Sequence, residues 1–250
     1  MSEPNDPIRV AQKLAKPELP KRFYRSVTVA EEAGGAVVRL DERTLKTPRR
    51  SALALPSREL AEAIAAEWDA QADEIDPATM PVTRLVNAAV DAVMASPDPV
   101  RAEIVAYAGN DLLCYRADGP AGLVERQAEL WDPPMEWLAR EHTAPLAIVA
   151  GVVPVDQPQA SLDRITTIVE RYEGYALAAL HSATTLTGSA ILALAHGEGQ
   201  LAADTAWQAA HVDEDWQIGQ WGEDAEASAR RAARWREMEA AALVLAEVRR

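Results

Sequence analysis

The chain has 250 residues and a formal net charge of −14, and 48% of its residues are apolar, enough for a sizeable core. This acidic balance excludes a broad phosphate-binding face, so we expect no nucleic-acid partner. The single cysteine, Cys114, excludes an intrachain disulfide and favours a reducing compartment. Because its first residues show no secretory or import pattern, the sequence predicts a cytoplasmic location.

The first 80 residues predict a flexible tail and then a small antiparallel β domain. Residues 1–20 hold four prolines and mixed charges, which is typical of a loosely attached segment. Alternating, β-branched stretches predict strands at residues 23–29, 36–40, 44–47 and 51–55. Residues 31–35 would form the turn of the first hairpin. A helix from Ser57 to about residue 72 would cover this sheet, because Leu60, Ile64 and Trp68 recur at intervals of four.

The remainder of the chain predicts a larger, mostly α-helical domain. Two prolines at residues 76–81 interrupt the pattern, which gives an α+β protein with a tail at 1–20, one domain at 21–80 and another at 81–250. Helices are predicted at residues 82–95, 98–108, 123–141, 159–173, 204–221 and 223–249, and on both sides of Gly188 within residues 175–195. Residues 146–155 are rich in Val and Ile and predict an extended segment. The polar side chains of residues 175–195 and their break at Gly188 argue against membrane insertion.

Residues 207–224 are the most unusual segment, because they hold three of the seven tryptophans and a run of acids. On a single helix, one face would carry Trp207, His211, Glu214, Ile218 and Trp221. Glu214 would then lie in an apolar stripe and need a partner, either an arginine among residues 230–234 or a group on another protein. Asp213 and Gln217 would form a polar ribbon beside the stripe, with Val212 and Trp216 on the far side. Whether the stripe faces the core or a partner stays open.

Catalytic and metal sites have weak support in the sequence. The histidines are scattered singly, so we expect no metal site and no cofactor. Residues 197–202 resemble a dinucleotide fingerprint in outline but follow a predicted helix, which favours an interhelical turn. The adjacent acids at 213–215 point in three directions and cannot jointly chelate a metal on an intact helix. An enzyme that uses His211 with these nearby acids stays open as an alternative.

Several motifs resemble a single protein family, in consistent order from about residue 21 to beyond residue 222. The residues that carry the resemblance are Arg22-Phe23-Tyr24-Arg25, Asp41, Lys46-Thr47-Pro48, Glu67-Trp68, Met80-Pro81, Asp111 to Arg116, Gln127, Trp131-Asp132-Pro133, and Glu214 with Gln217, Trp221 and Gly222. The family is the assembly chaperone for the α subunit of the F-type ATP synthase catalytic head, known in mitochondria as ATP synthase assembly factor 2.

The resemblance implies a two-domain bacterial protein that is not an enzyme. Family members bind the unassembled α subunit, keep it from aggregating, and release it when the β subunit takes its place. The resemblance implies structural roles for Phe23, Tyr24, Asp41, Lys46, Pro48, Trp68 and Trp131. It implies client binding by Asp213, Glu214, Trp216, Gln217 and Trp221. No small-molecule substrate is expected.

Overall fold

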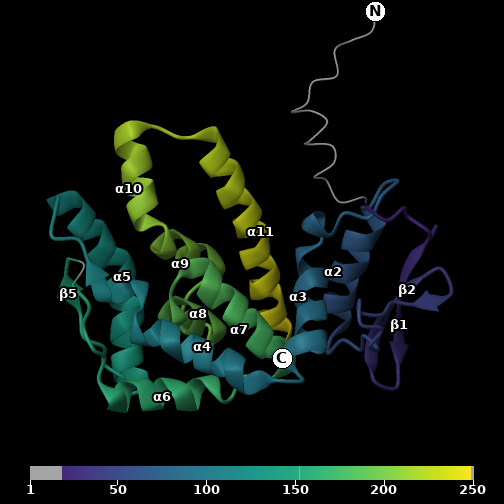
Figure 1. The fold of residues 1–250 in the computed structure, drawn as a ribbon, viewed down its shortest axis with the longest axis horizontal. Coiled ribbons are helices and arrows are strands. Elements are labelled where there is room, and N and C mark those ends of the chain that lie inside the picture. The colour runs from purple at the N-terminus through teal and green to yellow at the C-terminus, as the bar shows by residue number, and fades with distance from the viewer. Residues whose placement is uncertain (1–18, 152, 249–250) are drawn as a thin grey trace, which may run out of the picture.

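The computed structural model describes residues 19–151 and 153–248, so residues 1–18 of the tail predicted at 1–20, and the end of the last helix at Arg249, lie outside the described residues. The predicted α+β class is confirmed: a small antiparallel sheet precedes a mostly helical region. Figure 1 shows the sheet at one end of the molecule and the helical body at the other. Within the described residues, no helix has the length and apolar content needed to cross a membrane.

The sheet contains strands β1 (Val27–Glu32), β2 (Gly35–Leu40) and β3 (Arg43–Thr44), in that order, and both pairings are antiparallel. The predicted hairpin is confirmed with a tighter turn, Ala33-Gly34. Gly35 is required there, because a Cβ at its φ of 129° would lie 2.4 Å from the carbonyl oxygen of Leu55.

Three predicted strands in this region are wrong in extent, and of the one expected at residues 44–47 only Thr44 lies in a strand, β3. The first begins at Val27, because the backbone amides of Arg25 and Ser26 donate to the carboxylate of Asp41 over 3.0 and 2.9 Å and are not used in a strand ladder. The stretch at residues 51–55 forms only isolated bridges, Ala36 with Leu55 and Lys46 with Ala52. Asp41 therefore organises the entry to the sheet.

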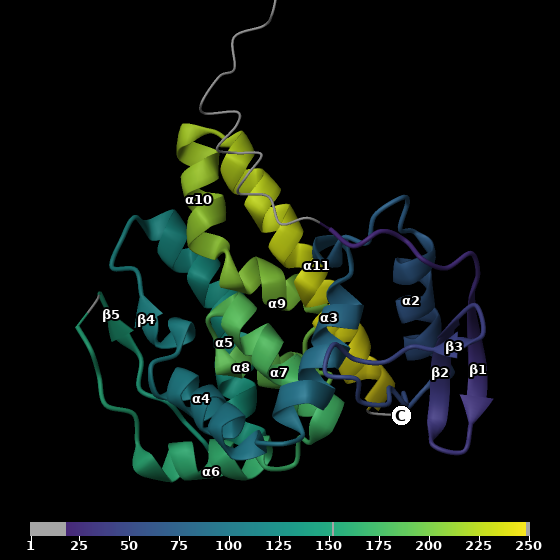
Figure 2. The same ribbon diagram turned by 45° about the vertical axis from the view of Figure 1, so that its right-hand side comes forward.

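Helix α2 (Arg58–Asp69) covers the sheet as predicted, with contacts to β1 and β2. The Ser57 hydroxyl caps its start by accepting a hydrogen bond from the amide of Leu60 over 3.1 Å. Leu60 and Ile64 are fully buried, which confirms the predicted apolar face. Figure 2 shows α2 standing between the sheet and the helical body.

The carboxylate of Glu67 joins the sheet region to the helical region. It accepts the backbone amides of Val82 and Thr83, each over 2.7 Å, and the Thr83 hydroxyl over 2.6 Å, at the start of helix α3 (Pro81–Ala88). Gln71 braces the intervening turn by donating to the Glu67 carbonyl and accepting from the amide of Asp76. An anionic side chain at a helix N-terminus satisfies otherwise unpaired amides and opposes the positive end of the helix dipole.

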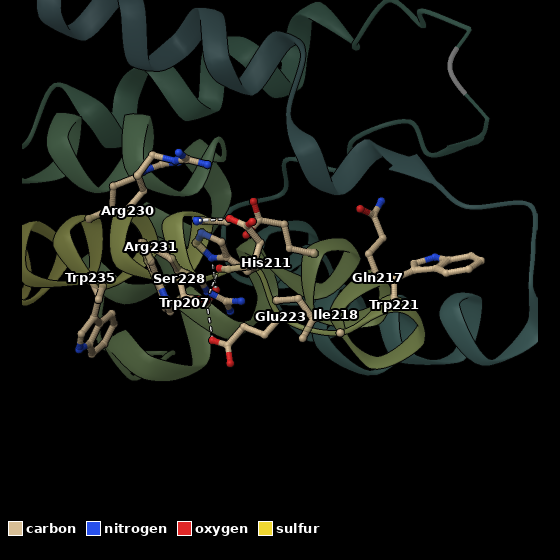
Figure 3. Close-up of a pocket in the computed structure, with 16 residues that line it drawn as sticks. Trp207, His211, Gln217, Ile218, Trp221, Glu223, Ser228, Arg230, Arg231 and Trp235 are labelled. Atoms are coloured by element: carbon tan, nitrogen blue, oxygen red, sulfur yellow. Dashed lines mark hydrogen bonds between the residues drawn. The ribbon is translucent and has the colours of Figure 1, made fainter. Parts of the chain in front are cut away.

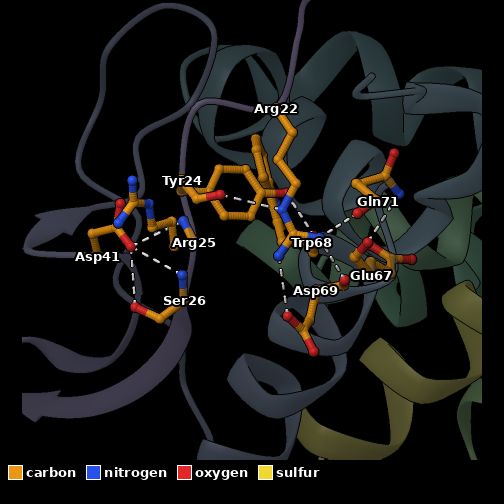
Figure 4. A network of polar contacts seen from close by, with 9 residues as sticks. All are labelled: Arg22, Tyr24, Arg25, Ser26, Asp41, Glu67, Trp68, Asp69 and Gln71. Carbon is orange, nitrogen blue, oxygen red and sulfur yellow. Dashed lines mark hydrogen bonds and ion pairs between the residues drawn. The ribbon is translucent and has the colours of Figure 1, made fainter. Parts of the chain in front are cut away.

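The N-terminal segment is fastened to the end of α2 by a network shown in Figure 4. The Tyr24 hydroxyl donates to the Trp68 carbonyl over 2.6 Å, and the Arg22 guanidinium donates to the carbonyls of Asp69 and Gln71. Buried side chains on both sides of residues 76–81 belong to one cluster. The two-domain division therefore stays a prediction.

The rest of the chain is helical apart from one short parallel strand pair. In chain order the elements are the 3₁₀ turn η1 (Pro77–Thr79), α3, the π-helical turn η2 (Ala89–Val93), α4 (Pro97–Gly109), the 3₁₀ turn η3 (Leu112–Cys114), β4 (Tyr115–Arg116), α5 (Ala121–Glu141), β5 (Val149–Ala150), α6 (Gln159–Val169), α7 (Gly174–Thr187), α8 (Ala190–Gly197), α9 (Ala203–Ala210), α10 (Val212–Trp221) and α11 (Ala225–Val248). The predicted break at Gly188 is confirmed, with a left-handed φ of 69°. Of the extended segment predicted at residues 146–155, only β5 forms a strand, paired with β4.

Asp111 is a fully buried carboxylate beneath the centre of the helical body. It accepts the amides of Leu113 and Ile191, each over 3.1 Å, and so ties η3 to the start of α8. Burial raises the pKa of Asp111 to about 6, against the lowering effect of these amides and the Ser189 hydroxyl.

The raised pKa of Asp111 predicts a specific pH dependence of stability. The folded state holds this proton more tightly than the unfolded state, so the contribution is fully present below about pH 4 and is lost as pH rises through 6. Relative to Asp111→Asn, we expect the free energy of unfolding of the wild type to fall by up to about 3 kcal/mol across this window. Urea unfolding of both proteins at several pH values measures the difference. A wild-type free energy of unfolding that stays constant or rises relative to that of Asp111→Asn as pH increases would contradict the assignment.

Replacing Glu67 tests the joint between the two regions. In Glu67→Gln a side-chain NH2 group replaces one of the two carboxylate oxygens that accept the backbone amides at the start of α3. One of these amides then loses its acceptor, so we expect a loss of about 2 kcal/mol in the free energy of unfolding. The control is Glu62→Gln on the same helix, which breaks only the exposed pair with Arg58 and should cost less than about 1 kcal/mol. Equal losses in the two variants, measured by urea unfolding, would rule out the capping role.

Candidate functional site

The single helix predicted at residues 204–221 is wrong: α9 ends at Ala210 and α10 starts at Val212. Two side chains contact backbone carbonyl oxygens near the end of α9. The indole N–H of the fully buried Trp131 donates to the Ala209 carbonyl over 2.7 Å, and Nδ1 of His211 lies 2.8 Å from the Trp207 carbonyl oxygen. The chain therefore turns at His211, and α10 leaves the helical body in a new direction.

Helix α10 rests on α5 through two contacts. The side-chain amide of Gln127 donates to Asp213 over 2.7 Å, while its oxygen accepts the backbone amide of Ala117. The Trp216 ring lies against Gly122 and under the guanidinium of Arg126, 5.5 Å from its centre. Asp213 and Trp216 thus hold α10 in place on α5.

An ion pair links α10 to α11. The Arg231 guanidinium donates to the carboxylate of Asp215, and this contact raises the pKa of Arg231. Asp215 is therefore not a free surface charge either. A second ion pair, between Glu226 and Arg230, joins residues one turn apart on α11.

A cleft of about 770 Å³ lies between α10 and α11. Its lining includes the five residues predicted to share one helix face, Trp207, His211, Glu214, Ile218 and Trp221. Figure 3 shows Trp235 and Trp221 at opposite ends of this cleft. Although the predicted helix is broken, these five residues still lie together, and they line the cleft.

Glu214 is exposed, so the prediction of a carboxylate buried in an apolar stripe is wrong. The turn at His211 swings α10 away from the core that a continuous helix would have met. Within residues 19–151 and 153–248, Glu214 has no hydrogen bond or ion pair. The arginines proposed as its partners are engaged elsewhere, Arg231 with Asp215, Arg230 with Glu226, and Arg234 with the Leu186 carbonyl.

The aromatic floor of the cleft is formed by three side chains. The Trp207 ring lies 4.0 Å from the His211 ring and 5.5 Å from the Trp235 ring, centre to centre. Burial lowers the pKa of His211, which favours the neutral imidazole. At the open end, Trp221 is 88% exposed and Ile218 is 37% exposed.

The remaining motif residues lie outside the cleft. Tyr24, Asp41 and Trp68 take part in the polar contacts around the sheet, and Trp131 ends α9. Phe23, Lys46 and Pro48 are exposed on the sheet region. The predicted site residues include neither Trp235 nor Gly122. The spacing of Ser228, Arg231 and Trp235 along α11 is a signal that could have identified the second wall of the cleft.

Comparison with known proteins identifies relatives over most of the chain. A family model described as ATP12 chaperone protein matches residues 21–139. Atp12 from Paracoccus denitrificans is 43% identical, with 91% of this chain and 98% of that chain covered and a TM-score of 0.83. The Atu1473 protein of Agrobacterium tumefaciens is 45% identical, with coverage of 99% and 92% and a TM-score of 0.87. Mitochondrial protein atp12 of Schizosaccharomyces pombe is 24% identical over 214 residues, 81% of this chain and 74% of that protein.

These features define a chaperone-type protein: a small sheet fixed to a helical body that carries an exposed aromatic cleft. The chain belongs to the ATP12 chaperone family. The resemblance inferred from its motifs is thereby confirmed.

Gly122 provides a test of how α10 is held. A Cβ at this position would lie 2.8 Å from the Trp216 ring, so Gly122→Ala should displace the ring and tilt α10. The matched control is Gly219→Ala on α10, where a Cβ meets nothing within 4 Å and should add about 0.5–1 kcal/mol of stability through helix propensity. Near-ultraviolet circular dichroism and urea unfolding distinguish the two. Equal gains in stability with unchanged spectra would contradict this role.

Proposed function

We propose that this protein is an assembly chaperone that binds the unassembled α subunit of the F-type ATP synthase catalytic head until the β subunit replaces it. The observation that carries the proposal is the cleft face of α10, which presents Trp221, 88% exposed at the end of the helix, and Glu214, an exposed carboxylate in its first turn that has no hydrogen bond or ion pair within the described residues. A large aromatic group on a surface is costly unless a partner covers it. The family membership of the chain supports a chaperone role for this surface.

In this proposal Glu214, Gln217 and Trp221 contact the client, because all three are exposed and line the cleft. Asp213 and Trp216, expected from the resemblance to bind the client, are assigned to holding α10 on α5. An aromatic anchor with polar groups around it is the usual composition of a binding hot spot. Modest affinity would let the β subunit displace the chaperone.

The proposed work requires no cofactor, small-molecule substrate, nucleic acid or membrane insertion, and we place it in the bacterial cytoplasm. Cys114, the only cysteine in the sequence, is buried and can form no intrachain disulfide, as is usual for proteins of a reducing compartment. Burial raises the pKa of Cys114 to about 12, so this thiol is an inert core group.

The alternative is a small-molecule enzyme that uses His211 with nearby acids. The cleft does bring His211 and Glu214 into one lining, which is the observation that favours it. However, Asp213 and Asp215 are occupied by Gln127 and Arg231, and Nδ1 of His211 is held by the Trp207 carbonyl. A general base needs an orienting group and a nucleophile or substrate proton within reach, so the chaperone proposal accounts for more of the site.

Co-expression tests the proposal directly. The α subunit produced with this protein, in the absence of the β subunit, should stay soluble and co-purify with it. The β subunit should then release the chaperone, which should be absent from the finished synthase. If α aggregates equally with and without the protein, the proposal fails. Retention in the purified synthase would instead identify a permanent subunit.

Charge reversal at Glu214 separates recognition from folding. Glu214→Lys should abolish the rescue of α solubility, while its thermal unfolding midpoint stays close to that of the wild type, because exposed substitutions change stability by about 0.5 kcal/mol or less. Glu239→Lys, an exposed site on α11 outside the cleft, is the control and should rescue normally. A collapsed fold in Glu214→Lys would show that Glu214 is structural.

A further inference from the structure

The walls of the cleft are two helix faces that do not pack on each other. On α10 the cleft face carries Glu214, Gln217, Ile218 and Trp221, and on α11 it carries Ser228, Arg231 and Trp235. Spacings of three and four residues are typical of faces that become buried. Here α10 packs on α5, and a cleft of about 770 Å³ separates it from α11. Pockets of roughly 300–1,000 Å³ bind small ligands, so the space suits a few side chains of a partner.

All but one of the charged side chains that line the cleft make a hydrogen bond or an ion pair within the described part of the chain. Asp215 neutralises Arg231, Glu226 neutralises Arg230, and Arg234 donates to the Leu186 carbonyl. The other two acids at the mouth are also engaged. Glu223 accepts the Ser228 hydroxyl, and Asp224 caps α11 by accepting the Ala227 amide over 2.7 Å. Among the residues that the structure describes, Glu214 is the cleft carboxylate left without such a contact.

This distribution of charges favours a positively charged side chain as the occupant of the cleft. An acidic side chain would meet Glu214, Glu223 and Asp224, while two of the three arginines in the lining, Arg230 and Arg231, already pair with carboxylates and the third, Arg234, donates to a carbonyl. A basic side chain would find Glu214 without a hydrogen bond or ion pair, in a lining that also carries Trp207, Trp221 and Trp235. Carboxylates and indole rings both attract ammonium and guanidinium groups.

We propose that this cleft receives a segment of the client chain that presents a lysine or arginine beside an apolar side chain. The cation pairs with Glu214, and the apolar side chain packs against Ile218 and Trp221. The inference rests on the proposed function and adds the chemistry of the bound segment. The pairing explains why Glu214 is exposed and unpaired on a helix whose other two acids, Asp213 and Asp215, both have partners.

Overlapping short peptides from the α subunit, probed with the full-length chaperone, test this inference. The bound peptides should contain a basic residue next to apolar residues. Changing that residue to Gln should weaken binding by about tenfold or more, equivalent to about 1.4 kcal/mol. Glu214→Gln should cause a similar loss, whereas the control Glu239→Gln should bind as the wild type does. Glu214→Lys should regain binding to a peptide whose basic residue is changed to Glu.

The outcomes separate this inference from the proposed function. If intact α subunit binds but the selected peptides are acidic or carry no charge, the inference is wrong and the chaperone proposal stands. The same holds if Glu214→Lys binds the basic peptides as tightly as the wild type. If neither intact α subunit nor any of its peptides binds, both proposals fail.

Discussion

The buried indole of Trp131 is the constraint on which the binding surface depends. By donating to the Ala209 carbonyl over 2.7 Å, it occupies an acceptor that a continuing helix would have used, and α9 ends one residue later. The turn at His211 then directs α10 outward, where Gln127 and Gly122 of α5 receive Asp213 and Trp216. Without this turn, Glu214 and Trp221 would lie on the extension of α9, and the cleft beside α11 would not form.

The carboxylate of Glu67 is a second constraint, because it fixes the sheet region to the helical region. Glu67 belongs to α2, which covers the sheet, yet it caps α3, the first helix of the larger region. The turn at residues 47–51 adds a further link, because the hydroxyls of Thr47 and Ser51 donate to Asp91 on η2. A third link is the Tyr175 hydroxyl of α7, which donates to the Ala54 carbonyl over 2.9 Å. In Figure 1, α10 and the first turns of α11 extend above the helical body, whereas the rest of α11 packs on α7.

Sequence patterns correctly predicted the features that depend on residues close together in the chain. The interval of four between Leu60 and Ile64, the Ser57 cap and the break at Gly188 are properties of neighbouring residues, and each is confirmed. The errors came from distant contacts. The backbone amide of Arg25 donates to Asp41, which lies 16 residues away in the sequence, and the indole of Trp131 donates to Ala209, which lies 78 residues away. A pattern read within one strand or one helix does not contain such partners. For the candidate site, periodicity correctly grouped Trp207, Glu214 and Trp221, but the burial of Glu214 depended on the direction of α10.

In this account Asp213, Asp215 and Trp216 hold α10 in place. The remaining face of the helix is exposed and binds the client. Hydrogen exchange on the complex with isolated α subunit tests this claim most directly. Amides of residues 212–235 should become protected on binding, while those of the sheet at residues 27–44 should not change. Protection confined to residues 21–80, with α10 and α11 unaffected, would contradict the account.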